Sequence, residues 1–223
     1  MQTEIISFYC DIDGSTYYSD NASRLIEECK NLKIPFDFRK INSHGDYRLN
    51  CLRKPKFILN ILEEKKKPIV WLDIDSKIHK QLDVFDKFVN LHVDLGFSYF
   101  ETDKTKINVM QPKASPIFCN YNEKVINFLK MWLRECEKTL KSEERFFDHE
   151  ILMFRVLPFF VSQMSIGCLP LSYCVWPGRC PPDIDPYITM GIADGKSKEK
   201  NIRELAEKIG MSEDGILLNL NRI

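Results

Sequence analysis

The sequence predicts an α/β fold, with a mixed, largely parallel β-sheet flanked by helices and a C-terminal helical appendage. Two short apolar runs, residues 5–10 and 69–72, have the composition of strands that are buried on both faces of a sheet. An amphipathic helical pattern at residues 22–32 and a further apolar stretch at 36–41 follow the first run. This strand–helix–strand order predicts a right-handed crossover.

The same alternation of elements continues along the chain. Asp20 or Asn21 is expected to cap the helix that carries the 22–32 pattern. The further elements expected are a helix starting near Pro55, a half-buried strand at 93–99, strands at 107–111 and 117–120, helices at 122–140 and 146–156, irregular chain at 169–186 and helix at 197–223. We expect one domain over residues 1–190, with 191–223 as a helical extension packed on it.

Composition excludes several classes of protein. Hydrophobic residues make up 44% of the 223 residues and aromatic residues 12%, which supports a sizeable core. Lys plus Arg and Asp plus Glu are balanced at 32 each, so no global field attracts nucleic acid, and no nucleic-acid partner is expected. No apolar run reaches membrane-spanning length and no signal segment is recognisable, so a cytoplasmic protein is expected, in the host cytoplasm if the source is viral. The eight cysteines form no Cys-x-x-Cys pair and are expected to be reduced.

Two carboxylates, Asp73 and Asp75, stand where the apolar run 69–72 ends. In open α/β sheets, ligands bind at the carboxyl ends of the strands. An acid-x-acid pair there suits a hard divalent cation that also binds a substrate phosphate. The structural alternative is an ordinary acidic turn after a strand, since Asp-x-Asp is a common pattern.

A second Asp-x-Asp motif supports a competing function. Asp11-Ile-Asp13-Gly-Ser-Thr resembles the opening motif of haloacid-dehalogenase-type phosphatases, which implies a nucleophile at Asp11 and a general acid at Asp13. That family also needs a later acidic pair for magnesium. Gly191-Ile-Ala-Asp-Gly offers one Asp, and the opening turn carries an extra Ser. This phosphatase is kept as an alternative.

A larger part of the chain resembles GT-A-fold glycosyltransferases. The resemblance covers about residues 4–175. It rests on a first strand ending in Asp11, Tyr17-Tyr18 before a helix, Arg53-Lys-Pro-Lys-Phe-Ile, Ile69-Val-Trp-Leu-Asp-Ile-Asp, and Phe147-Asp-His-Glu-Ile-Leu followed by Leu169-Pro170. It implies an enzyme, similar to compact bacterial or viral sugar transferases, that uses Mn²⁺ or Mg²⁺. The donor would be a nucleotide-diphosphate sugar, most often a UDP-sugar, and the acceptor a hydroxyl of a glycan or glycoprotein.

The resemblance also implies roles for individual residues. The metal would be bound by Asp73 and Asp75, and Asp148 would be the catalytic carboxylate facing the acceptor hydroxyl. The implied nucleotide-sugar-binding residues are Tyr9, Asp11, Tyr17, Arg48, Lys54 and Asp73. The sequence departs from the pattern in one respect, because no histidine follows His149 and the late metal-binding histidine of many relatives is missing.

Each implied role has a structural alternative. Tyr17 has the character of a core aromatic, Lys54 could lie at a solvated helix start, and Asp148 could be a helix N-cap. A third hypothesis is a non-catalytic binding protein, since Leu205-Ala-Glu-Lys-Ile-Gly-Met-Ser has helix-turn-helix spacing. Acidic residues surround that segment and would repel phosphate, which favours a structural appendage.

Overall fold

The computed structural model describes residues 1–11, 15–44, 46–101, 110–176, 180–181 and 183–191. Asp13, most of the expected strand 107–111, the helical extension from residue 192 onward and its helix-turn-helix-like segment lie outside the described residues.

A mixed sheet forms the centre of the described chain, with strand order β2-β1-β3-β6-β5-β7. Its strands are β1 (Glu4–Tyr9), β2 (Phe36–Lys40), β3 (Ile69–Trp71), β5 (Leu95–Glu101), β6 (Met110–Cys119) and β7 (Ile166–Leu169). β1 runs parallel to β2 and β3, and β7 runs parallel to β5, while β6 is antiparallel to both of its neighbours. A small second sheet pairs β4 (Lys77–Ile78) with β8 (Ile188–Thr189). The predicted α/β class with a mixed sheet is confirmed.

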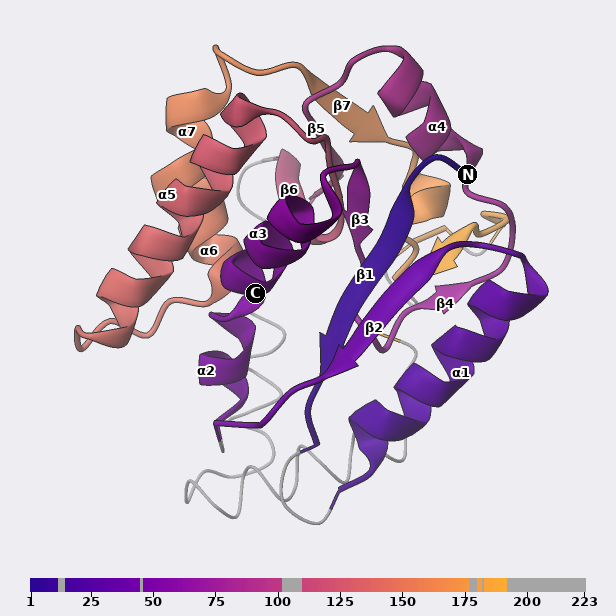
Figure 1. Ribbon diagram of the computed structural model, residues 1–223, viewed down its shortest axis with the longest axis horizontal. Coiled ribbons are helices and arrows are strands. Elements are labelled where there is room, and N and C mark those ends of the chain that lie inside the picture. The colour runs from indigo at the N-terminus through magenta and orange to yellow at the C-terminus, as the bar shows by residue number, and fades with distance from the viewer. Residues whose placement is uncertain (12–14, 45, 102–109, 177–179, 182, 192–223) are drawn as a thin grey trace.

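Helices cover both faces of the sheet (Figure 1). One face carries α3 (Lys54–Lys65), α5 (Glu123–Leu140), α6 (Asp148–Ile151), a π-helical turn η1 (Leu152–Val156) and α7 (Leu157–Phe160). The opposite face carries α1 (Tyr17–Asn31) and α4 (Asp83–Asn90), with the 3-10 turn η2 (Leu171–Tyr173). The two hydrophobic clusters follow strand alternation, because Trp71 packs toward α3 and α5 whereas Val70 packs toward α1 and α4.

The expectation of a half-buried strand at 93–99 is wrong. Ser98 is 1% exposed, and Gly96 lies directly under the ring of Phe88 in α4, where an added Cβ would be 2.5 Å from Phe88 Cε2. A small residue is needed at Gly96 because α4 packs closely on this face of the sheet. The alternation of small or polar residues with apolar ones therefore does not mark a face that is exposed to solvent. Asp94 is buried as well and accepts hydrogen bonds from Asn122 Nδ2 and the Ser165 amide, each near 2.7–2.8 Å.

Several expected boundaries also differ. The strands expected at 107–111 and 117–120 belong, in the described part, to the single strand β6. The helix expected at 146–156 begins at Asp148 and continues through η1 and α7 to Phe160. Helix α1 begins at Tyr17, one turn before the expected caps, because the Asp11 carboxylate accepts the Ser19 amide at its first turn. Between β2 and α3 the chain forms a short helix, α2 (Tyr47–Cys51), which Asp46 caps.

Candidate functional site

The first carboxylate of the predicted pair, Asp73, follows β3 at the carboxyl end of the strand, beside β6. Its backbone amide donates to Ser115 Oγ at 2.8 Å. Its Oδ1 accepts from the indole Nε1 of Trp71 at 2.9 Å. Trp71 and Asp73 are two residues apart, so an extended chain places both side chains on the α3 side of the sheet. The strand itself therefore orients this carboxylate.

Lys54 joins that carboxylate to a second one. It is the first residue of α3 and is only 7% exposed. Its Nζ lies 2.8 Å from Asp148 Oδ2 and 3.2 Å from Asp73 Oδ1, and it donates to the Ala114 carbonyl at 3.2 Å. The alternative of a solvated helix start is therefore wrong for Lys54. This lysine is a buried cation held between two carboxylates from different elements.

Asp148 is 3% exposed and faces Lys54. Burial by itself would raise the pKa of this carboxyl, but the charges and hydrogen bonds of Lys54 and His149 together outweigh burial and lower the pKa to about 2. The N-cap of α6 is Phe147, whose amide donates to Glu150 Oε2 at 2.8 Å, so the alternative that Asp148 is the N-cap is wrong. Asp148 is an ionised partner of Lys54 at neutral pH.

The second carboxylate of the pair, Asp75, lies among tyrosines. Burial, followed by the negative charge of Asp75, raises the pKa of both Tyr17 and Tyr18. The Tyr17 and Tyr18 rings meet edge to face with centroids 4.8 Å apart. The negative charge of Asp75 also acts on the hydroxyl of Tyr47 in α2. Aromatic hydroxyls of both α1 and α2 are thus within reach of the charge of Asp75.

Helix α1 also fixes the backbone of that turn. Arg24 Nη2 donates to the carbonyls of Asp75 and Ser76, at 3.4 and 3.0 Å. The Ile78 amide donates to Glu28 Oε2 at 2.9 Å. A turn held in this way presents its carboxylates in a fixed direction.

Other predicted site residues have structural partners outside this cluster. The Asp11 carboxylate accepts the Ser19 amide at 2.9 Å and the Ser19 hydroxyl, and Lys40 Nζ lies 3.5 Å away. Burial raises the pKa of Asp11, but these partners outweigh burial and lower it. Tyr9 is partly buried against the α1 side of the core. Arg48 Nη1 donates to the Glu144 carbonyl at 3.4 Å. The nucleotide-binding roles of these residues stay predictions.

Sequence reasoning missed the residues that position the carboxylates. Trp71 belongs to an apolar run that predicts only a buried strand, and Ser115 and Arg24 belong to none of the motifs. Ser115 and Arg24 make hydrogen bonds to segments far away in the sequence. Trp71 makes one to Asp73, two residues further along the same extended chain. No local sequence pattern marks such contacts, apart from the i, i+2 spacing of Trp71 and Asp73.

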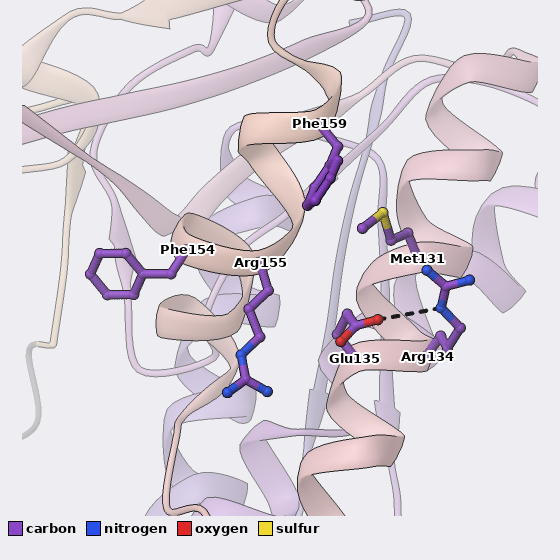
Figure 2. Close-up of a pocket in the computed structure, with 6 residues that line it drawn as sticks. All are labelled: Met131, Arg134, Glu135, Phe154, Arg155 and Phe159. Atoms are coloured by element: carbon purple, nitrogen blue, oxygen red, sulfur yellow. Dashed lines mark hydrogen bonds and ion pairs between the residues drawn. The ribbon is translucent and has the colours of Figure 1, made fainter.

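A separate hollow of about 610 Å³ lies between α5 and the η1–α7 segment (Figure 2). Its lining residues are Met131, Arg134, Glu135, Phe154, Arg155 and Phe159. Its two arginines are already paired, Arg155 with Glu144 at 2.8 Å and Arg134 with Glu135 at 3.4 Å. It contains none of the predicted site residues.

The same architecture occurs in a solved glycosyltransferase, one involved in the glycosylation of the major capsid of PBCV-1. The two structures match with a TM-score of 0.65, over 89% of this chain and 98% of that one, at 12% sequence identity. The chain has a GT-A-like glycosyltransferase fold. No protein-family model and no curated protein sequence matches the chain. Among the described residues, no helix is long and apolar enough to cross a membrane.

Proposed function

We propose that this protein is a metal-dependent glycosyltransferase that moves a sugar from a nucleotide-diphosphate sugar, a UDP-sugar in the first instance, to a hydroxyl group of a glycan. The observation that carries the proposal is the Asp73–Asp75 pair on a GT-A-like fold. One carboxylate is oriented by Trp71 and Lys54, and the turn bearing the other is held by Arg24. Both lie at the carboxyl end of a central strand, where such sheets bind ligands.

Two carboxylates suit a metal ion whose remaining ligands come from the substrate and from water. The described residues contain no group of three or more His, Cys, Asp or Glu side chains placed to bind a metal ion. Mn²⁺ or Mg²⁺ is commonly bound by one or two carboxylates, with substrate phosphates and water completing the shell. Asp73 and Asp75 would supply the protein ligands. When bound, the cation would act as a Lewis acid toward the departing diphosphate.

The remaining residues have positioning roles in this proposal. Lys54 and Trp71 both contact Oδ1 of Asp73, which restricts the rotation of that carboxylate. Asp148 neutralises Lys54 and holds it in place. A carboxylate whose pKa is about 2 is a weak base at neutral pH, so the geometry supports this use of Asp148 more directly than proton abstraction from the acceptor. The catalytic role that the resemblance implies for Asp148 stays a prediction.

UDP binding measured by calorimetry, with and without Mn²⁺, tests the proposal. We expect wild-type protein to bind UDP more tightly with Mn²⁺, and Asp75→Asn to lose that dependence while its circular dichroism spectrum is unchanged. Asp83→Asn, which changes an exposed carboxylate at the start of α4, is the matched control and should bind as wild type. Equal UDP affinity in wild type and Asp75→Asn in the presence of Mn²⁺ contradicts the assignment.

A further inference from the structure

Three rings from two segments form a continuous row beside the carboxylates. Tyr47 in α2 contacts Phe147 with ring centroids 6.1 Å apart. Phe147 in turn stacks on the His149 ring at 5.9 Å with an interplanar angle of 27°. We call this row, made of Tyr47, Phe147 and His149, the aromatic ledge. Tyr47 is 44% exposed, so at least one end of the ledge is open to a ligand.

The aromatic ledge is already held in place. Asp46 caps α2 by accepting the Leu49 amide at 2.8 Å. Arg48, next to Tyr47, donates to the carbonyl of Glu144, just before the segment that carries Phe147 and His149. These contacts tie the two halves of the ledge together, so a ligand would not have to order them.

The ledge adjoins the proposed reaction centre. Asp148 stands between Phe147 and His149 in the chain, and its Oδ1 lies 3.9 Å from His149 Nδ1. The charges of Asp75 and Asp73 act on the Tyr47 hydroxyl. In Figure 1, α2 and α6 lie on the opposite side of β1 from α1, which carries Tyr17.

Ring faces next to carboxylates are complementary to a neutral sugar. The apolar C–H face of a pyranose can pack on an aromatic ring, and its hydroxyl groups donate hydrogen bonds that carboxylates accept. Lys54, the cation of the cluster with Asp148 and Asp73, is already paired with both carboxylates and is not available to bind a phosphorylated or otherwise anionic acceptor. We propose that the aromatic ledge is the acceptor subsite and that it binds a neutral sugar ring of a glycan. This inference rests on the proposed function.

Saturation-transfer NMR on the full chain tests it, with methyl glycosides of glucose, galactose, mannose and xylose as probes. Each probe is added to protein saturated with UDP and Mg²⁺, which is diamagnetic, and separately to protein without UDP. We expect transfer to at least one glycoside in wild type, and a loss of at least fivefold in Tyr47→Ala. Tyr47→Phe keeps the ring and should retain the signal. Tyr121→Ala, which removes another exposed tyrosine next to the N-cap of α5 at the far end of the sheet, should also retain it.

The outcomes separate the subsite from the function on which it rests. Equal glycoside signals in wild type and Tyr47→Ala, or no signal with any of the four probes, overturn the subsite. A tenfold fall of UDP affinity in Tyr47→Ala also overturns it, because the ring would then belong to the donor site. If wild-type protein fails to bind UDP but still binds a glycoside through Tyr47, the proposed function fails and the sugar-binding ledge stands.

Discussion

At the scale of single residues, the site depends on one buried lysine. Lys54 has carboxylate oxygens of Asp148 and Asp73 within 3.2 Å, and its ammonium lies 5.4 Å from the centre of the Trp71 ring. A buried charge is tolerated only when it is paired, and removal of one partner leaves the other unsolvated. The orientation of Asp73 and the stability of the protein should therefore respond to the same substitutions.

Asp148→Asn should lower the free energy of unfolding by roughly 3 kcal/mol, because Lys54 loses its closest partner while remaining buried. The double variant Asp148→Asn with Lys54→Met should lose less free energy of unfolding than the two single variants lose together. Urea denaturation of the four proteins measures the coupling. The control is Glu144→Gln, which breaks an exposed pair with Arg155 and should leave the free energy of unfolding nearly unchanged. Additive single changes would show that the pair is not coupled.

The stability difference between wild type and Asp148→Asn should depend on pH in the acid range. The pKa of Asp148 is about 2 in the folded protein and 3.8 ordinarily. A lowered pKa stabilises the folded state above the ordinary value, and this contribution is lost as the pH falls through the folded one. The wild-type advantage should be complete above about pH 4 and shrink by on the order of 2 kcal/mol toward pH 2. Denaturation curves measured between pH 2 and 5 that keep a constant difference would contradict this.

At the scale of elements, two glycines allow helix α4 to pack closely on the sheet. Helix α4 rests its Phe88 ring on Gly96 of β5 and on Gly167 of β7, where an added Cβ would lie 2.5 and 2.7 Å from ring atoms. These two strands are parallel neighbours with Gly96 opposite Gly167 in register. One ring thus fills the space above a pair of adjacent glycines.

Gly96→Ala should destabilise the protein by roughly 1–3 kcal/mol, because the new methyl group overlaps the Phe88 ring in a packed core. The double variant Gly96→Ala with Phe88→Leu should recover part of the loss, since the smaller side chain makes room for the methyl group. Thermal unfolding followed by circular dichroism measures both. Ser98→Ala, on the same strand and also buried, adds no volume and serves as the control. An unchanged midpoint in Gly96→Ala would refute the close packing.

At the scale of the whole molecule, the order β2-β1-β3-β6-β5-β7 makes β1 and β3 neighbours, so Asp11 and Asp73, both predicted to bind the donor, follow strands that lie side by side. The carboxyl ends of β1 and β3 point the same way because these strands are parallel neighbours. Asp11 and the Asp73–Asp75 pair therefore follow adjacent strand ends, although about sixty residues separate them in the chain. The two Asp-x-Asp hypotheses therefore concern neighbouring positions. A phosphatase would use Asp11 as its nucleophile, whereas a transferase would use Asp73 and Asp75 to bind a metal ion.

UDP with Mn²⁺ should stabilise the folded protein, because the binding residues come together only in the folded state. At a concentration one hundred times its dissociation constant, the gain is about 2.7 kcal/mol. For a chain of this size that raises the unfolding midpoint by roughly 5–10 °C.

The protein should not hydrolyse p-nitrophenyl phosphate. Hydrolysis that Asp11→Asn abolishes and Ser19→Ala preserves would instead favour the phosphatase, because the second variant keeps the carboxylate and removes only its hydroxyl partner.

The sequence by itself determined the α/β class, the strands on either side of α1 and the position of Asp73 and Asp75 at a strand end. These follow from local periodicity and from the abrupt change from apolar to acidic residues. Tertiary structure decided which side chains meet. Lys54 and Asp148 are more than ninety residues apart in sequence, and only the packing of α3 on α5, and of α5 on α6, brings them to 2.8 Å. It also decided that the alternating strand 93–99 is buried on both faces, because solvent exposure depends on which helices cover a strand.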